Sequence, residues 1–239
     1  MDFITASDML PAHDLTLLGF GPHAYPMLAE LAAAHWGKEA SQLRVQVIHN
    51  LPASQEMLQG VMPASWRAPG FTPLEKWQPS EADGTCMLGV LREPAASAVW
   101  GAVHAATGLS ETALGVVVHP SADIAPSAVL GPGTWVQPHA TVATMSRLGM
   151  CSYVNRHASV GHHNVWGAFS RINPGAHTAG SVVLGDRVTI GMGALIREGT
   201  CLANGAVVGA GSLVLKDVGQ DQTVMGVPAK PRIPQRAAS

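Results

Sequence analysis

The chain has 239 residues, enough for two domains, and its 14 Lys and Arg nearly balance its 16 Asp and Glu, which argues against a nucleic-acid partner. Three cysteines, odd in number and far apart, argue against a disulfide framework and favour a reducing compartment. Because no apolar run reaches the length of a membrane span and the start lacks the basic segment of a signal peptide, we expect a cytoplasmic protein.

The first clear pattern is an apolar strand over residues 15–18, followed by a glycine-containing turn and a helix. Gly19 and Gly21 permit a tight turn, and Pro22 suits the first position of a helix that continues to Trp36. A helix N-terminus reached through glycines can bind an anion such as a diphosphate. The last glycine of the dinucleotide-binding fingerprint is absent, so a plain strand-to-helix turn is an equally good interpretation.

Further strands and a helix follow in the first half of the chain. Residues 43–49 predict a second strand that ends at Asn50, where nucleotide-binding folds often place a polar residue against a ribose. Residues 51–80 are rich in Pro and Trp and predict irregular structure. Residues 86–91 predict a third strand, and residues 93–107 a helix that a glycine ends. Alternating strands and helices predict a small, doubly wound parallel sheet.

From Val118 to Val218 the sequence repeats every six residues. The first column of the repeat is almost entirely aliphatic, the column four residues later is mostly small, and Pro or Gly often lies between them. The first column consists of Val118, Ile124, Leu130, Val136, Val142, Leu148, Val154, Val160, Trp166, Ile172, Thr178, Leu184, Ile190, Ile196, Leu202, Val208 and Val214. A period of six fits neither a helix nor a plain strand and predicts a β-helix with three short strands per triangular coil. The aliphatic column should point into the prism, with Pro or Gly at the turns.

These patterns predict three parts. Residues 1–113 should form an α/β domain with a small Rossmann-like parallel sheet, which would bind the nucleotide of a nucleotide-linked substrate. Residues 114–219 should form an all-β, left-handed parallel β-helix of hexapeptide repeats. Residues 220–239 break the period and are expected to be a C-terminal tail.

Histidines gather in the repeat. They are His139, His157, His162, His163 and His177. Residues eighteen apart stack, because one coil contains three hexads, and this places His139 directly beneath His157. His162 follows an inward-facing residue by two positions and falls at a turn. Three interpretations of such a histidine stay open: a hydrogen-bonded surface residue, a metal ligand, or a general base that takes a proton from an amine or hydroxyl.

The order of a small nucleotide-type fold, the segment 118–122, the hexads and the segment 226–230 (GVPAK) resembles the bacterial sugar O- and N-acetyltransferases. This group includes the sialic-acid O-acetyltransferases and the enzymes that acetylate UDP-linked 4-amino sugars. The resemblance covers residues 15–232. In that family the stretch corresponding to 158–165 carries the catalytic histidine, which falls on His162. The resemblance implies that His162 deprotonates a sugar acceptor, which attacks the thioester of acetyl-CoA directly, without an acyl-enzyme.

This sequence departs from the family pattern beside the histidine. The family usually flanks that residue with a carboxylate, which orients the imidazole and raises its basicity. Here the flanking residues are Gly161 and His163. A carboxylate from a neighbouring subunit and Asn164 are the two candidate replacements.

The resemblance also implies binding residues and an assembly. Arg171 stands where the family often has a cofactor-binding histidine, and Gly180, one coil above His162, would leave room for the pantetheine arm. Lys216, Lys230 and Arg232 are candidates for the phosphates of CoA. The residues expected to face a nucleotide-sugar acceptor are Gly19, Gly21, His23 and Asn50. Family members are trimers with active sites between subunits, so we expect a homotrimer.

Two alternative functions remain open at this point. The γ-class carbonic anhydrases share the coil and bind zinc through three histidines, two of them five residues apart, as His157 and His162 are. The third ligand would fall on Ser121, which does not bind zinc, so we predict no metal site. A non-catalytic scaffold that binds a sugar nucleotide is the second alternative, because the flanking carboxylates are missing.

Overall fold

The computed structural model describes residues 14–49, 55–58, 61–80 and 83–232. The chain divides into two compact units, Met1–Val117 and Val118–Ser239. Within the described ranges, no helix is long and apolar enough to cross a membrane.

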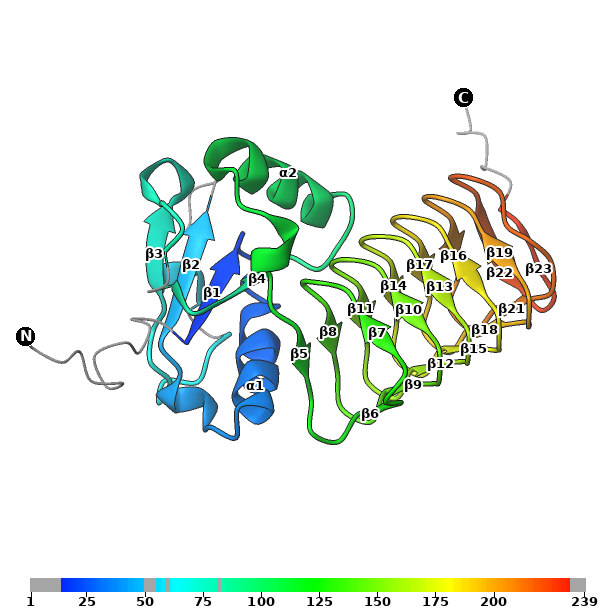
Figure 1. The fold of residues 1–239 in the computed structure, drawn as a ribbon, viewed down its shortest axis with the longest axis horizontal. Coiled ribbons are helices and arrows are strands. Elements are labelled where there is room, and N and C mark those ends of the chain that lie inside the picture. The colour runs from blue at the N-terminus through cyan, green and yellow to red at the C-terminus, as the bar shows by residue number, and fades with distance from the viewer. Residues whose placement is uncertain (1–13, 50–54, 59–60, 81–82, 233–239) are drawn as a thin grey trace, which may run out of the picture. The chain divides into compact units, whose positions relative to one another are not determined.

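The first unit is built on a four-stranded parallel sheet with the order β3-β2-β1-β4 (Figure 1). Its strands are β1 (Leu15–Leu18), β2 (Val45–His49), β3 (Gly70–Pro73) and β4 (Thr85–Leu88). The α-helix α1 (Tyr25–His35) follows β1, and α2 (Ala95–Thr107) follows β4. Short 3-10 helices also lie in the described part of the unit: Ala40–Gln42, Gln55–Leu58, Leu74–Lys76 and Glu111–Ala113. The predicted parallel sheet is therefore confirmed, with β1 fully buried between β2 and β4.

Two local predictions in this unit are wrong. Strand β3 lies inside residues 51–80, which the sequence predicted to be irregular, and it pairs with β2 at the edge of the sheet. An edge position tolerates Pro73, so the proline that argued against a strand does no harm there. Helix α1 begins at Tyr25 rather than Pro22, and Pro26 occupies its first turn, where a missing N–H costs nothing. The second helix ends as predicted, because Gly108 takes a left-handed φ of 68°.

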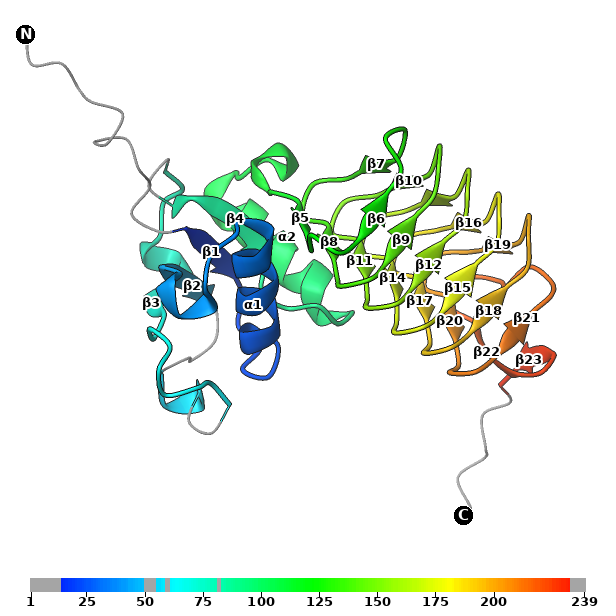
Figure 2. The same cartoon turned by 90° about the horizontal axis from the view of Figure 1, so that it is seen from below.

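The second unit is a stack of coils whose two-residue strands form three parallel sheets (Figures 1 and 2). The first sheet contains β7 (Val129–Leu130), β10 (Arg147–Leu148), β13 (Val165–Trp166), β16 (Val183–Leu184) and β19 (Cys201–Leu202). The second contains β6 (Asp123–Ile124), β9 (Thr141–Val142), β12 (Ser159–Val160), β15 (His177–Thr178), β18 (Leu195–Ile196) and β21 (Leu213–Val214), which stand in one row in Figure 2. The third contains β5 (Val117–Val118), β8 (Trp135–Val136), β11 (Tyr153–Val154), β14 (Arg171–Ile172), β17 (Thr189–Ile190), β20 (Val207–Val208), β22 (Thr223–Gly226) and β23 (Ala229–Pro231).

The aliphatic column of the repeat fills the interior of these coils. From Val136 to Val214 every member of the column is buried, including Trp166 and Thr178. Each strand pairs with the strand eighteen residues along, as Val160 does with Thr178. Burial of one Val, Leu or Ile side chain contributes roughly 1.5–3 kcal/mol before the entropy of ordering is subtracted. The predicted parallel β-helix of hexapeptide repeats is confirmed, and its left-handedness stays a prediction.

The turns rely on one residue with left-handed backbone geometry, three positions after each inward-facing residue from Leu130 to Val208. Glycine occupies this position in some coils, as at Gly193 with a φ of 63°. In others a side chain is present: His139, Met145, Cys151, His157, His163, Phe169, Ser181 and Arg187 all have φ between 53° and 59°. The left-handed region costs a non-glycine residue roughly 1–2 kcal/mol. The turns are thus less dependent on glycine than the sequence pattern predicted.

The segment after Val218 is not a tail over its described part. Strand β22 continues the third sheet beyond β20, with Val208 opposite Val224, and β23 turns back to pair antiparallel with β22. Val224 is buried against the end of the prism. Because the last coil of a repeat stack has no following neighbour, such a hairpin covers an otherwise open end.

Candidate active site on the β-helix

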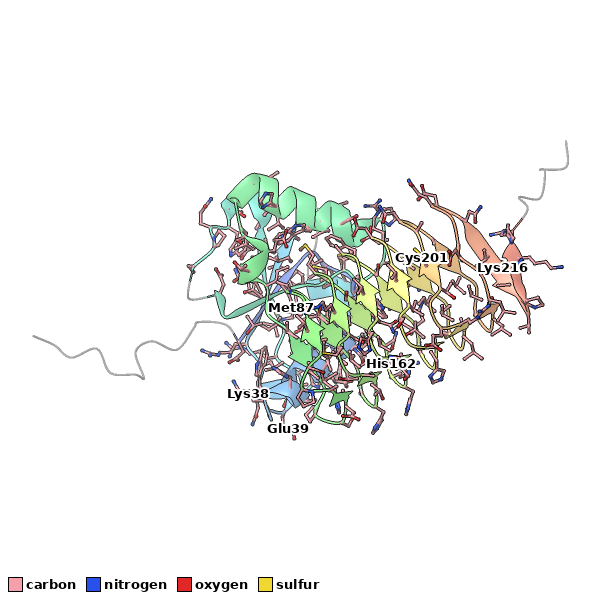
Figure 3. All side chains as sticks on the ribbon, turned by 45° about the vertical axis from the view of Figure 1, so that its right-hand side comes forward. Lys38, Glu39, Met87, His162, Cys201 and Lys216 are labelled. Carbon is pink, nitrogen blue, oxygen red and sulfur yellow. The ribbon has the colours of Figure 1, made fainter. Side chains whose placement is uncertain are left out.

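His162 lies at the turn that follows β12, and its side chain is exposed (Figure 3). The coils on both sides hold the backbone of this turn. The carbonyl of His162 accepts a hydrogen bond of 2.8 Å from the N–H of Ser181 in the next coil. The N–H of His163 donates to the carbonyl of Thr144 in the preceding coil, at 3.0 Å. The imidazole is therefore carried by a backbone with little freedom.

Two residues define the surroundings of the His162 ring. Its Nδ1 atom lies 3.1 Å from Nδ1 of His163, and the two rings meet edge to face at 86°. On the other side lies Gly180, where an added Cβ would be 2.5 Å from Nε2 and 2.9 Å from Nδ1 of His162. Real Cβ atoms do not approach that closely, so any side chain at position 180 would displace the ring. The sequence assigned Gly180 to the pantetheine arm, and the contact in the structure is with the imidazole.

A buried polar network lies directly behind this turn. Asn164 is fully buried, and its Nδ2 donates to the carbonyls of Gly161 and Ala179, both at 2.8 Å, and to that of His162 at 3.3 Å. Ser146, also fully buried, donates to the Gly161 carbonyl at 2.7 Å and accepts from the Asn164 N–H at 3.2 Å. These bonds satisfy polar groups that would be costly to bury alone and fix the path of the chain through His162. The sequence offered no signal for Ser146, because buried serines recur throughout the small column.

The position before His162 has no room for a side chain. A Cβ added to Gly161 would lie 2.5 Å from the carbonyl carbon of Ala179 and 2.7 Å from the carbonyl oxygen of Thr178, which are both backbone atoms. This backbone therefore does not admit a carboxylate at position 161. The Asn164 amide, which the sequence suggested as an alternative partner, donates to carbonyl groups of the backbone and accepts a 3.5 Å bond from the Trp166 indole. Within the described part of this chain, the ring nitrogen of His163 is the side-chain group that hydrogen-bonds the imidazole.

Arg171 lies on a different sheet from His162 within one chain. It belongs to β14 in the third sheet, where its Nη2 donates to Oδ1 of Asn173 at 2.8 Å and its guanidinium carbon lies 5.8 Å from the ring centre of Tyr153. Burial raises the pKa of Tyr153 to about 12, although the positive charges of Arg171 and Arg156 oppose that shift. The structure holds this guanidinium in place but does not bring it to His162 of the same chain.

Lys216 lies toward the C-terminal end of the prism, away from His162 (Figure 3). It lines a cavity of about 440 Å³ together with Lys230, Asp217 and residues of the β22–β23 hairpin. Two ammonium groups beside one hollow suit an anionic ligand. Arg232, the third cation expected here, is exposed at the end of the described chain, and its N–H donates to the Thr223 carbonyl at 2.7 Å.

The residues expected to bind a nucleotide follow β1 in the first unit. Gly19 has a φ of 83°, and a Cβ there would lie 2.9 Å from the Val99 side chain. Gly21 lies near the carbonyl of Gly89, which follows β4, and His23 is exposed. The chain adds β2 and β3 on one side of β1 and then adds β4 on the other side, so the strand order switches between β1 and β4. In doubly wound folds, ligands bind beyond the carboxyl ends of the strands at such a switch point. Asn50 lies outside the described residues.

The stacked histidines do not form a chelating cluster. The rings of His139 and His157 lie face to face, with centres 5.1 Å apart and an angle of 21°. Burial lowers the pKa of the nearby His119, and His139 lowers it further. Within the described residues, no group of three His, Cys, Asp or Glu side chains could hold a metal ion.

Comparison with known proteins gives structural matches. No protein-family model and no curated protein matches the chain. The acetyltransferase domain of PglB from Neisseria gonorrhoeae is 28% identical, with a TM-score of 0.74 over 91% of this chain and 98% of that one. Its complex with acetyl coenzyme A gives 27% identity and a TM-score of 0.73, again over 91% and 98% of the two chains.

Two further structures match over nearly their whole length. PerB from Caulobacter crescentus, in complex with CoA and GDP-perosamine, is 23% identical, with a TM-score of 0.73 over 92% of this chain and 97% of that one. WeeI from Acinetobacter baumannii is 18% identical, with a TM-score of 0.73 over 91% and 99%. At such identities these two matches concern the fold alone. The resemblance to acetyltransferases expected from the sequence is confirmed by the acetyltransferase domain of PglB, and the sugar acceptor stays a proposal.

Proposed function

We propose that the protein is an acyltransferase that moves the acetyl group of acetyl-CoA to a nitrogen or oxygen of a sugar, with an amino sugar linked to a nucleotide as the favoured acceptor. The observation that carries the proposal is the exposed imidazole of His162, which the fold holds between Gly180 and His163 above a buried network. The PglB domain, which is similar over nearly the whole chain, was crystallised with acetyl coenzyme A. PerB, which shares the fold, was crystallised with CoA and GDP-perosamine.

The chemistry requires one base. Acetyl-CoA supplies the thioester. His162 Nε2 takes the proton that the acceptor nitrogen or oxygen loses as it bonds to the acetyl carbon, and then gives it to the sulfur as the carbon–sulfur bond breaks. The acetyl group passes directly to the acceptor, without an acyl-enzyme. A positioned general base contributes about 10²- to 10⁴-fold to the rate.

Binding of the donor is proposed at two places. Lys216 and Lys230, which line the cavity at the end of the prism, would bind phosphate groups of CoA. Arg171 would act from a second copy of the chain, because its own His162 lies at the turn after β12, which belongs to another sheet. The outer face of the first sheet supports assembly, since Val129 and Val165 are each 48% exposed in a single chain. We propose a homotrimer in the cytoplasm, with the reaction between subunits.

The first unit is proposed to bind the nucleotide of the acceptor. Gly19, Gly21 and His23 follow β1 at the point where the strand order of the sheet reverses, and Gly21 would let backbone N–H groups approach a diphosphate. Asn50 keeps its proposed role toward the ribose.

A panel experiment tests this function. The protein is incubated with acetyl-CoA and, one at a time, with UDP-, GDP-, CMP- and dTDP-linked amino sugars and their hydroxyl counterparts, and released thiol is measured. Thiol release should depend on one class of acceptor, and the same compound should raise the melting temperature by binding the folded protein. If an acceptor raised the melting temperature while none stimulated thiol release, the protein would be a sugar-nucleotide-binding scaffold and the proposed transfer would be wrong. Light scattering of the same sample tests the trimer.

A further inference from the structure

The hydrogen bond between His162 and His163 links the tautomers of the two rings. The two Nδ1 atoms are 3.1 Å apart, a hydrogen-bond distance, so one of them carries a hydrogen and the other accepts it. If His162 carries the hydrogen on Nδ1, its Nε2 has a free lone pair and can act as a base. If His163 carries the hydrogen instead, the neutral His162 must hold its own proton on Nε2 and cannot take another there.

We propose that His163 is a positioning residue that selects the basic tautomer of His162, in place of a carboxylate. This inference rests on the proposed function, and it identifies the group that orients the base His162. His163 Nδ1 accepts the hydrogen on Nδ1 of His162, and the proton of His163 is on Nε2. The acceptor of this hydrogen bond is thus a neutral ring rather than an anion.

Among the neighbours of His162 within one chain, the structure leaves this role to His163. Position 161 has no room for a side chain, and the Asn164 amide donates to backbone carbonyls. His163 has a left-handed φ of 57°, and its N–H bond to Thr144 holds the turn in that geometry.

The Nδ1–Nδ1 hydrogen bond makes the proton position on each ring depend on the other ring. The groups that the adjacent coils place beside it are Thr144, Met145, Gly180 and Ser181, none of which titrates near neutral pH. A proton on His163 reverses the Nδ1 hydrogen bond, and a proton on His162 Nε2 occupies the base directly, so both events stop the reaction. A carboxylate in place of His163 would stabilise the imidazolium and make the base protonate at higher pH.

Two substitutions that suit the left-handed turn separate this role from a structural one. His163→Gly removes the ring and relieves the backbone, whereas His163→Asp provides an anionic acceptor at a position that Asp tolerates. His163→Gly should lower kcat about 10- to 100-fold, with KM for acetyl-CoA unchanged, because the base loses its orientation. His163→Asp should restore most of kcat and move the acid limb of kcat/KM about one pH unit higher.

A direct readout needs no turnover. In ¹⁵N-labelled wild-type protein, two-bond ¹H–¹⁵N correlations should show His162 with its proton on Nδ1 and His163 with its proton on Nε2 at pH 8. In His163→Gly, His162 should shift toward the Nε2–H form that predominates in free histidine. A wild-type His162 already in the Nε2–H form would overturn the inference. So would a His163→Gly variant with wild-type kcat and acid limb.

These results also separate the inference from the proposed function. Loss of acetyl transfer in His162→Asn with unchanged transfer in His163→Gly would refute only the role of His163. If the wild-type protein transferred no acetyl group to any acceptor, the proposed function would be wrong. The tautomer spectra would still confirm or refute the arrangement of the pair.

Discussion

Asn164→Ala offers a quantitative test of how the fold holds the catalytic turn. The substitution removes an amide that is fully buried and donates to three carbonyls. Two of those carbonyls keep another partner: that of Gly161 keeps the Ser146 hydroxyl, and that of His162 keeps the Ser181 N–H. The principal loss is therefore at the carbonyl of Ala179.

The expected cost follows from these contacts. A buried acceptor left without a partner costs about 1–3 kcal/mol, and the space left by the amide adds a smaller amount. We expect Asn164→Ala to lower the free energy of unfolding by about 2–4 kcal/mol, which corresponds to roughly 4–16 °C in melting temperature for a chain of this size. The turn should also loosen, so kcat should fall although Asn164 touches no substrate.

The isosteric change Asn164→Asp sharpens the test, because it places a carboxylate among carbonyl oxygens. That environment raises the pKa of the new carboxyl above its unfolded value. The variant should therefore be most stable at low pH and lose stability as the pH rises toward the folded pKa, by about 1.4 kcal/mol for each pH unit that separates the folded pKa from the unfolded one. Asn164→Ala should show no such dependence relative to the wild type.

Urea denaturation at several pH values measures both variants. A cost below about 0.5 kcal/mol for Asn164→Ala, or an Asn164→Asp variant whose stability relative to the wild type does not change between about pH 4.5 and pH 8, would contradict this interpretation of the network.

Three further predictions use the same measurements. Ser146→Ala and Ser170→Ala each remove a buried hydroxyl, which donates to a carbonyl fifteen residues ahead at 2.7 Å and accepts from an N–H eighteen residues ahead. Both variants should therefore lose about 1–2 kcal/mol in the free energy of unfolding. Only Ser146→Ala, which lies behind His162, should also lower kcat in the acetyl-transfer assay, and an equal kinetic effect of both would refute the assignment. Arg187→Gly should raise stability by about 0.5–1 kcal/mol in urea titrations, because it removes a left-handed φ of 58°, and a loss of stability would contradict the strain. Asp14→Asn should destabilise the protein at neutral pH, because burial raises the pKa of Asp14 but hydrogen bonds from Arg44 and Lys38 lower it more. The stability advantage of the wild type should be present above about pH 4 and vanish in acid, and an advantage that persisted in acid would contradict the prediction.

The sequence predicted the β-helix well because its core repeats locally. Each inward-facing residue, such as Val160 or Ile172, follows the previous one by six positions. The core can therefore be predicted from the local sequence, without knowing which distant segments pair. Strand β3 was missed for the opposite reason. It is a four-residue edge strand that contains Gly70 and Pro73, and only its pairing with β2 makes it a strand.

The candidate site was predicted only in part. A resemblance was enough to point to His162, but the proximity of His163 depends on the direction of two side chains at one turn. The exclusion of a side chain at Gly161 depends on the backbone of the coil above, at Ala179. Whether Arg171 can reach His162 depends on the sheets from which the two side chains project. Their separation of nine residues in the sequence does not predict that arrangement.

The most direct test of the proposed chemistry is the turnover number of His162→Asn. With the acceptor identified by the panel, this variant should lose about 10²- to 10⁴-fold in kcat, while KM for acetyl-CoA and for the acceptor stay within about twofold of the wild type. Asparagine keeps a polar side chain at the turn but cannot take the proton of the acceptor. A variant that transfers acetyl groups at the wild-type rate would show that the imidazole of His162 is not the base.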